Sequence, residues 1–411
     1  MKKPIRFLIP NVTSASNIGD EAMLEVLIGL ITENYPDAHI TVQSSEPETH
    51  AIAEIKKLNS TFYYWAVFEN PSILSRLYRM SLLAILCVGL YFSLSPLISL
   101  VTSVSARIKS MLFDYEHADV IVYVGGGYLR SKAGFSQSLN VVMLLLPFWL
   151  AKFFTAKRIV APISIGPFAA EWQARLTGAI LHTFETVATR EKFSYNTISK
   201  YKPKNLILAS DHALLLSKKT GKQRKSAVPI VGFTIREWLG DARQKQLENT
   251  YIDALEKIAK SQDVVIQPIV QVDAPKFGEG DGVVTERVAA ALRNRGIAVK
   301  PAVFVTSVEH AKEVYKPLSL LVGMRMHSNI IAGTQGVPFV PVSYEYKTEG
   351  IAIDFGLSEF CIKCFEITAE TLLSHIEHIL KHRDSLSKRI EGNLKRIQRK
   401  EQVRWLKVLS V

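Results

Sequence analysis

The segment 323–328, Gly-Met-Arg-Met-His-Ser, has the residue types in this sequence that are best suited to chemistry. It lies after an apolar run, so we expect it to follow a strand and to precede a helix over Asn329–Thr334. In an extended backbone, alternation places Arg325 and His327 on the same side, while Ser328 can cap the helix. The helix N-terminus adds backbone N–H donors and a positive dipole end. The pattern predicts an anion site beside a titratable imidazole, although an isolated histidine is more often a core residue.

Two shorter segments could add polar groups at the ends of predicted strands. Asn17, Gly19 and Asp20 follow the first strand and open a helix. Gly19 permits a close backbone approach, and Asp20 is equally suited to cap the helix or to contact a substrate hydroxyl. Lys347 follows a later strand and places another cation at the same end of a sheet. These residues are candidates for binding a polar or anionic substrate.

Three consecutive glycines follow another apolar strand. The run Asp119–Val124 leads directly into Gly125, Gly126 and Gly127. Side chains are absent there if a ligand or the opposing domain approaches the backbone, but strand-ending glycines also make tight turns. The segment is neither a complete dinucleotide fingerprint nor a P-loop, because the later glycine and the Gly-Lys-Ser/Thr are missing.

An arginine follows a further short apolar run. Arg190 comes after Glu185–Ala188 and before the helix-like segment Lys192–Lys200. At such a strand end its side chain would point into a cleft. The alternative is a surface ion pair with Glu191, which the local sequence alone favours.

Apolar runs of strand length alternate with helix-length segments along the chain, which predicts α/β architecture with parallel sheets. We expect two Rossmann-like domains that face a cleft: residues 1–217, a basic linker at 218–227, residues 228–380, and a basic C-terminal helix at 381–411. Ligands in such sheets bind at the carboxyl ends of strands. The predicted strands are Ile5–Ile9, His39–Gln43, Asp119–Val124, Arg158–Ile165, Asn205–Ala209, Val228–Ile235, Asp263–Val270, Ile297–Val305, Ser319–Met324 and Pro338–Ser343.

Composition excludes several classes of protein. The 411 residues are 48% hydrophobic and 21% charged, which is typical of a globular protein and not of a disordered one. The net charge of +12 is concentrated in Ser217–Pro229 and Lys381–Lys407, so no nucleic-acid groove is indicated across the folded body. The chain has only three cysteines, and Cys361-x-x-Cys364 lacks the second pair of a structural zinc site, so we expect no metal and a reducing compartment.

One segment does not fit the alternating pattern. Residues 80–106 contain no charge, and Arg76, Arg79, Arg107 and Lys109 flank them. The length could span a bilayer, but serines, threonines and Pro96 interrupt the apolar run. We favour a helical hairpin broken near Pro96 that lies at a membrane surface over a true span. A helical insert packed inside the protein is an equal alternative.

Taken in order, the motifs resemble those of the polysaccharide pyruvyl transferase family. The resemblance covers roughly residues 5–357 and implies a GT-B-like fold of two Rossmann-type domains. It also implies transfer of the carboxyvinyl unit of phosphoenolpyruvate onto sugar hydroxyls, usually as a ketal, with Arg190 and Arg325 holding phosphoenolpyruvate and His327 beside it. The matching elements are Asn17-Ile-Gly-Asp20, Gly125–Gly127, Ser164-Ile-Gly-Pro167, Thr189-Arg-Glu191 with Ser194, Ser210-Asp-His-Ala213, Gly323–Ser328 and Tyr344-Glu-Tyr-Lys347.

The chemistry of ketal formation suggests a role for individual side chains. Guanidinium groups bind carboxylate and phosphate bidentately. We expect His327 to act as general acid/base, Lys347 to neutralise the leaving phosphate and Asp20 to orient an acceptor hydroxyl. No bound cofactor is required. The acceptor would be a sugar or a lipid-linked oligosaccharide of a cell-surface polysaccharide.

Two other functions remain open at this point. A nucleotide-sugar glycosyltransferase could use the same two-domain architecture, because fold does not fix function. A non-catalytic, membrane-associated subunit of polysaccharide assembly is the second alternative. We expect a cytoplasmic location, with peripheral contact to the cytoplasmic face of the inner membrane as a hypothesis.

Overall fold

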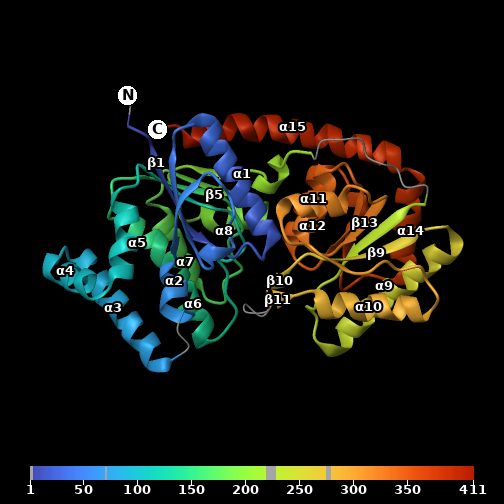
Figure 1. Ribbon diagram of the computed structural model, residues 1–411, viewed down its shortest axis with the longest axis horizontal. Coiled ribbons are helices and arrows are strands. Elements are labelled where there is room, and N and C mark those ends of the chain that lie inside the picture. Colours follow the sequence, from blue (N-terminus) through green and yellow to red (C-terminus); the bar gives the residue numbers. More distant parts are fainter. Residues whose placement is uncertain (1–2, 70–71, 219–227, 275–278) are drawn as a thin grey trace. The chain divides into compact units, whose positions relative to one another are not determined.

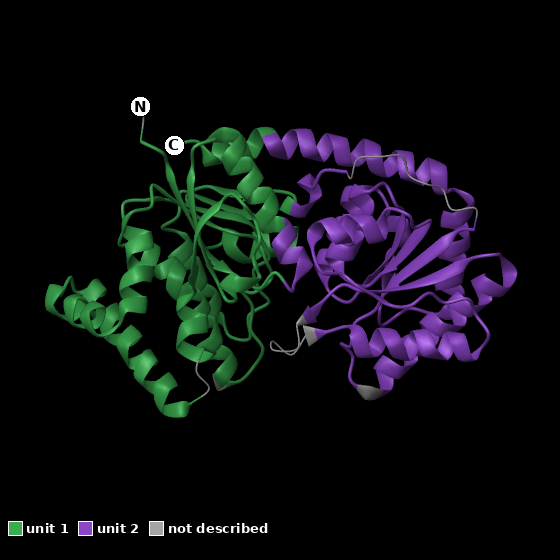
Figure 2. Cartoon of the chain, viewed as in Figure 1, with its two compact units in different colours: residues 1–15, 23–212, 403–411 green, residues 16–22, 213–402 purple. Residues whose placement is uncertain are grey.

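The computed structural model describes residues 3–69, 72–218, 228–274 and 279–411. The chain divides into two compact units that are each discontinuous in sequence (Figure 2). Unit 1 comprises Met1–Ala15, Met23–His212 and Val403–Val411, and unit 2 comprises Ser16–Ala22 and Ala213–Gln402. The predicted linker 218–227 lies, apart from Lys218, outside the described residues. The predicted domain boundaries stay predictions.

Unit 1 is built on a seven-stranded parallel sheet in the order β3-β2-β1-β4-β5-β6-β7. Figure 1 labels β1 and β5 of this sheet. The first strand lies inside the sheet, where Phe7 pairs with both Ile40 and Val120, and the strand order reverses beside it. This is the doubly wound arrangement. The strands are β1 (Arg6–Val12), β2 (His39–Ser44), β3 (Ile55–Ser60), β4 (Val120–Tyr123), β5 (Lys157–Ile163), β6 (Thr186–Thr189) and β7 (Leu206–Leu208).

Helices cover this sheet, and its inner strands, such as β1 and β4, are buried on both faces. A single core cluster joins residues of the sheet to the helices, including Tyr123 and Phe148, whose rings stack 3.9 Å apart. The helices are α1 (Ile18–Asn34), α2 (Phe62–Val67), α3 (Ile73–Tyr91), α4 (Ser95–Val104), α5 (Ala106–Glu116), α6 (Phe135–Ala151), α7 (Glu171–Leu181) and α8 (Lys192–Ser199), with the 3-10 turn η1 (Pro47–Thr49).

Unit 2 repeats the same winding in a six-stranded parallel sheet, in the order β12-β9-β8-β13-β14-β15. Its first strand, β8, lies between β9 and β13, so the order again reverses beside the first strand. A separate antiparallel pair is formed by β10 (Asp273–Ala274) and β11 (Glu279–Gly280). The sheet strands are β8 (Ile230–Thr234), β9 (Val265–Val270), β12 (Val303–Phe304), β13 (Leu320–Gly323), β14 (Phe339–Ser343) and β15 (Ile362–Lys363).

The helices of unit 2 follow its strands, as expected for parallel connections. The last helix, α15 (Arg383–Leu409), begins in unit 2, and its residues from Val403 onward belong to unit 1. The others are α9 (Asp241–Ser261), α10 (Gly282–Asn294), α11 (Val308–Tyr315), α12 (Met326–Thr334), α13 (Tyr346–Phe355) and α14 (Ala369–Lys381), with the 3-10 turns η2 (His212–Leu215) and η4 (Ser358–Phe360).

The predicted α/β class with two parallel sheets is confirmed, and most predicted strands exist within two or three residues of their expected ends. The strand predicted over Ile297–Val305 is wrong in extent, because only Val303–Phe304 pairs as a strand. Pro301 lies just before it and has no N–H to donate to a ladder.

The apolar segment predicted at 80–106 forms two helices, α3 and α4, that pack against each other. The break lies at residues 92–94, where Ser93 has a left-handed φ of 55°, just before Pro96. Helix α3 begins earlier than expected, at Ile73. Its residues Leu82, Leu83 and Leu86 are part of the core of unit 1, and burying such a side chain contributes about 2 kcal/mol each. The hairpin is therefore anchored on the body of unit 1.

Candidate functional site

The candidate site of unit 2 lies where the strand order of its sheet reverses, between β8 and β13. Thr234, the last residue of β8, pairs with Gly323, the last residue of β13. The backbone N–H of Met324 lies 3.1 Å from the Thr234 hydroxyl, which lies 3.0 Å from the hydroxyl of Ser328. Thr234 thus attaches the start of α12 to the end of β8. In doubly wound sheets this is the point where ligands bind.

His327 is the second residue of α12 and is only partly buried, whereas Met326 and Ser328 on either side of it are buried. The prediction of an extended backbone at 325–327 is wrong, because the helix already begins at Met326. His327 therefore lies in the first turn of a helix, where N–H groups and the dipole favour an anion.

The imidazole of His327 packs directly on the backbone of Gly19, which also belongs to unit 2. A Cβ atom at Gly19 would lie 1.9 Å from His327 Nδ1, which is far closer than van der Waals contact allows. Two motifs about three hundred residues apart in the sequence therefore meet here. Gly19 is required for the close approach that the sequence predicted, and the group that approaches is the imidazole.

Asn17 and Asp20 form a small polar turn beside Gly19. Asn17 directly precedes α1, and its side-chain oxygen accepts a 3.3 Å hydrogen bond from the Gly19 N–H. Its amide donates to Asp20 Oδ2 at 3.0 Å. Of the two alternatives for Asp20, the helix cap is wrong, because Asn17 directly precedes the helix and Asp20 is its third residue. A carboxylate there is favoured by the helix dipole. Contact with a substrate hydroxyl stays a prediction.

Arg325 is buried, and one edge of its guanidinium group is already occupied. Nε and Nη2 donate to the two carboxylate oxygens of Asp281 at 2.9 and 2.7 Å. Both side chains are nearly inaccessible, with 9% of Arg325 and 1% of Asp281 exposed. Asp281 thus holds one edge of this guanidinium group, and the predicted contact of Arg325 with phosphoenolpyruvate stays a prediction.

Ser328 and Lys347 are also engaged. The Ser328 hydroxyl donates to the carbonyl of Arg325 at 2.6 Å, so the prediction that Ser328 is the helix cap is wrong, and the residue lies inside the first turn. Lys347 Nζ forms a 2.7 Å ion pair with Glu345 at the start of α13. The predicted roles of both residues in substrate binding are untested.

The glycines after β4 are explained by packing inside unit 1. A Cβ at Gly125 would lie 2.4 Å from the carbonyl oxygen of Pro162 on the adjacent strand β5. A Cβ at Gly126 would meet the ring of Tyr128 at 2.7 Å. At these two positions the sequence suggested that a ligand or the opposing domain approaches the backbone. The structure shows instead the adjacent strand at Gly125 and an aromatic ring at Gly126. Gly127 is partly exposed.

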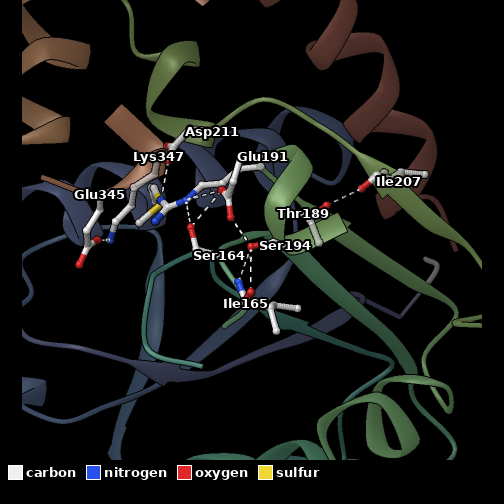
Figure 3. Close-up of polar contacts among 11 residues, drawn as sticks. Ser164, Ile165, Thr189, Glu191, Ser194, Ile207, Asp211, Glu345 and Lys347 are labelled. Atoms are coloured by element: carbon white, nitrogen blue, oxygen red, sulfur yellow. Dashed lines mark hydrogen bonds and ion pairs between the residues drawn. The ribbon is translucent and has the colours of Figure 1, made fainter. Parts of the chain in front are cut away.

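Arg190 lies in unit 1 in a buried polar network. Figure 3 labels three of its neighbours, Ser164, Glu191 and Asp211. Its Nη1 contacts Asp211 Oδ2 at 2.6 Å, and its Nε donates to the Ser164 hydroxyl at 2.7 Å. Ser164 in turn donates to Glu191, which also accepts from Ser194. The alternative, an ion pair with Glu191, is present at 3.7 Å, but it is not at the surface, because only 3% of the Arg190 side chain and 8% of the Glu191 side chain are exposed.

Sequence reasoning missed several residues at the carboxyl edge of the unit 2 sheet. Asp281 had no local signal, because its partner is 44 positions away. Arg236 follows β8, and its guanidinium carbon lies 4.6 Å from the ring centroid of Trp238 and 5.4 Å from that of Tyr344, which follows β14. The alternation of polar and aromatic residues after a predicted strand could have identified this cluster.

The three cysteines are poor nucleophiles or metal ligands. Burial raises the pKa of Cys361 to about 12 and those of Cys87 and Cys364 to about 11, so each thiol stays protonated near neutral pH. Among the residues that the structure describes, no cluster of three or more His, Cys, Asp or Glu side chains could hold a metal ion.

Comparisons with known proteins agree with the sequence motifs. The profile of the family described as polysaccharide pyruvyl transferase matches residues 17–346, which is most of the chain. The match includes both the Asn17–Asp20 turn and the segment 323–328. A search of curated proteins finds no match.

Solved structures share the fold at low sequence identity. A UDP-GlcNAc 2-epimerase from Neisseria meningitidis, bound to UDP-GlcNAc, is 10% identical, with a TM-score of 0.54 over 97% of this chain and 99% of that one. An Anabaena protein in complex with UDP and glucose is 11% identical, with a TM-score of 0.55 over 96% and 95%. The glycotransferase of kitacinnamycin is 12% identical, with a TM-score of 0.50 over 99% of both chains. The fold is therefore GT-B-like.

Proposed function

We propose an activity for this chain on the premise that it belongs to the polysaccharide pyruvyl transferase family, whose profile matches residues 17–346. The chain moves the carboxyvinyl unit of phosphoenolpyruvate onto two hydroxyls of a sugar, forms a pyruvate ketal and releases phosphate. The sugar belongs to a cell-surface polysaccharide or to its lipid-linked precursor. The observation that supports this most is the contact of His327 with Gly19, because it joins two family motifs in one place.

The donor binds at the start of α12 in this proposal. Phosphoenolpyruvate carries a carboxylate and a phosphate, and the first turn of α12 offers backbone donors to such an anion. Arg325 adds positive charge beside this turn, and Asp281 holds its guanidinium plane in one orientation. Asp281 therefore fixes the position of the Arg325 guanidinium group and balances its charge in a buried environment.

Protons move in two steps of the reaction. The methylene carbon of phosphoenolpyruvate gains a proton and becomes a methyl group, while one sugar hydroxyl loses its proton and attacks the adjacent carbon. A second hydroxyl of the same sugar then displaces phosphate, and its proton leaves with the phosphate. We assign the proton transfers to His327, because imidazole donates and accepts protons near neutral pH, and the orientation of an acceptor hydroxyl to Asp20.

A nucleotide-sugar glycosyltransferase is the second candidate function. The cluster of Arg236, Trp238 and Tyr344 favours it, because a cation between aromatic rings suits a nucleoside diphosphate. The solved structures that contain UDP or a UDP-sugar share the fold with this chain, and fold alone does not decide the donor.

Calorimetric titration of the purified chain separates the two functions. Phosphoenolpyruvate and a panel of nucleoside diphosphate sugars are titrated in parallel. Saturable binding of phosphoenolpyruvate supports the pyruvyl transferase, whereas binding of a nucleotide sugar with no response to phosphoenolpyruvate contradicts it. With acceptor present, release of inorganic phosphate gives the turnover.

Two variants test the assigned roles in the same titration. His327→Ala should lose turnover and keep most of its phosphoenolpyruvate binding. Replacing Arg325 alone would leave Asp281 buried without its partner, so we use the double variant Asp281→Asn/Arg325→Gln, which removes both charges and retains polar groups. It should fold and bind phosphoenolpyruvate at least tenfold more weakly, about 1.4 kcal/mol. Equal loss of binding in both variants would contradict the assigned roles.

A further inference from the structure

Helix α3 is apolar on both of its faces. Leu82, Leu83 and Leu86 pack into the core of unit 1, while Leu74, on the opposite face, is 79% exposed. A helix on the surface of a soluble protein normally turns a polar face to water. The outer face of α3 lacks one, which indicates that something other than water covers it.

The exposed apolar surface continues from α3 into the turn and α4. We define the hairpin surface by six exposed side chains: Leu74, Leu77, Tyr78, Tyr91, Phe92 and Leu100. In Figure 1, α3 and α4 lie at the outer edge of unit 1, beyond α5. Large apolar side chains that gather in this way mark an interaction site, whereas single ones are ordinary.

The charges around the hairpin surface are mainly basic. From Ser72 to Phe113 the sequence has no aspartate or glutamate, and it has four basic residues, Arg76, Arg79, Arg107 and Lys109. Arg79 and Arg107 both contact Glu69, and 55% of the Arg107 side chain is exposed. Lys152 Nζ lies 5.6 Å from the ring centroid of Tyr91. An apolar surface with more basic than acidic residues at its border complements anionic lipid headgroups.

Among the described residues, α3 is the one helix that is long and apolar enough to cross a membrane. A span would withdraw Leu82, Leu83 and Leu86 from the core of unit 1, where all three are buried. The opposite, exposed face can meet lipid without any change in these contacts. Tyrosines at the border, such as Tyr78 and Tyr91, are typical of side chains at the headgroup level.

We propose that the hairpin surface docks on a bilayer that contains anionic phospholipids, with α3 lying in the interface plane. The inference does not rest on the reaction proposed above. Docking would hold the chain at the surface where lipid-linked acceptors reside.

Flotation of the purified full chain with vesicles tests the proposal. Vesicles are made of phosphatidylcholine alone or of phosphatidylcholine mixed with phosphatidylglycerol. We expect the chain to float with the anionic vesicles, to bind the neutral ones more weakly and to be released by added salt. No binding to anionic vesicles, or equal binding to both kinds at all salt concentrations, would overturn the proposal.

Matched variants assign the binding to the hairpin surface. Leu74→Ser/Leu77→Ser/Tyr91→Ser should lower the partition onto anionic vesicles by roughly a hundredfold. The control Val283→Ser/Ile353→Ser/Phe365→Ser replaces three exposed apolar side chains of unit 2 and should leave the partition unchanged. Because the replaced side chains are exposed, we expect the hairpin variant to keep the thermal unfolding temperature of the wild type, and this measurement shows whether it folds. Equal loss in both variants would contradict the assignment.

Two other occupants of the surface give different results. If a second copy of the chain covers it, size-exclusion chromatography without lipid shows a dimer that the hairpin variant converts to a monomer, and vesicles do not bind. If α3 spans the membrane, alkaline carbonate fails to release the chain from membranes of cells that express it. Either result overturns the proposal. A chain that is monomeric without lipid, and that alkaline carbonate releases from membranes, supports it.

Discussion

The contact of Gly19 with His327 can be tested by adding a single methyl group at Gly19. Gly19→Ala places a Cβ 1.9 Å from His327 Nδ1, so the imidazole must move. We expect a loss of about 2 kcal/mol in the free energy of unfolding, as for other overpacked sites, and a larger loss in turnover. Chemical denaturation and the NMR signals of the His327 ring measure the two effects.

Gly29→Ala is the matched control, because it lies in the same helix and has nothing within 4 Å of its added Cβ. It should stabilise α1 by roughly 0.5 to 1 kcal/mol. An unchanged His327 signal in Gly19→Ala would contradict the described packing.

His212 should make the stability of the chain depend on pH. It is fully buried against the ring of Trp405, and burial lowers the pKa of its imidazole to about 4 although Asp211 opposes the shift. The unfolded chain therefore binds a proton that the folded chain does not between roughly pH 6.5 and 4. The free energy of unfolding keeps its full value above pH 6.5, and it falls by up to about 3 kcal/mol as the pH is lowered to 4.

Urea denaturation across this range measures the effect in wild type and in His212→Leu. Among the described residues, neither ring nitrogen of His212 has a hydrogen-bond partner, so leucine removes the titration without leaving a donor unpaired. We expect this variant to lose part of the slope, and the control His39→Gln, at an exposed position, to keep it. An unchanged slope in His212→Leu would show that other groups cause it.

The buried pair of Arg190 and Asp211 should respond to charge removal in a non-additive way. Arg190→Gln alone leaves Asp211 as a buried charge and should destabilise unit 1 by roughly 3 to 5 kcal/mol. Adding Asp211→Asn should restore much of that loss, as thermal unfolding of both variants would show. Phosphoenolpyruvate titration of the restored variant then tests the predicted contact of Arg190 with the donor, since retained binding would contradict it.

Among the helices and strands, one hydroxyl contributes to the attachment of α12 to β8, in addition to the hydrogen bond from the Met324 N–H to the Thr234 carbonyl. Thr234→Val keeps the shape of the side chain and removes the contacts with Met324 N–H and the Ser328 hydroxyl. We expect a loss of about 1 to 3 kcal/mol and weaker phosphoenolpyruvate binding. Thr250→Val on α9 is the control, because that hydroxyl donates to the Gln246 carbonyl of its own helix, and this variant should change neither.

Elements with a clear apolar pattern could be predicted from sequence, and polar ones could not. The runs that became β1, β8 and β13 are buried on both faces, so their composition identified them. Strand β3, Ile-Lys-Lys-Leu-Asn-Ser, lies at the edge of its sheet, where charged residues are common, and nothing in its pattern indicated a strand.

The candidate site was predictable in its residues and not in its contacts. The motifs at 17–20 and 323–328 could be singled out because each has polar residues next to a predicted strand. Their meeting depends on the tertiary fold, and so does the pairing of Arg325 with Asp281. Gly125 and Gly126 could be singled out as well, but the sequence could not tell why glycine is needed there, because close packing inside the protein and binding of a ligand both require a small residue.

For the chain as a whole, the last residues of α15 should control the stability of unit 1 in particular. Trp405 and Leu409 are fully buried, and the carbonyl of Val408 accepts a hydrogen bond from Lys157. Truncation after Gln402 should destabilise unit 1 by at least about 3 to 5 kcal/mol, as for the loss of a buried tryptophan. Hydrogen exchange followed by mass spectrometry should show faster exchange in β1 and β5 and unchanged exchange in β9 and β14.

Removal of Val411 alone is the control, because this residue is 69% exposed. It should have a small effect on exchange in either unit. Equal acceleration in both units after truncation at Gln402 would contradict the assignment of Val403–Val411 to unit 1.

The discontinuous make-up of unit 1 also sets the order of events on the ribosome. Residues up to His212 emerge first, but Val403–Val411 are the last part of this unit to be translated. At ordinary elongation rates of about 5 to 20 residues per second, unit 1 waits roughly 10 to 40 seconds for Trp405. Unit 2, from Ala213 to Gln402, is translated in between apart from its short segment Ser16–Ala22. Until then nascent unit 1 lacks two of its fully buried side chains, Trp405 and Leu409, so its core stays incomplete for that interval.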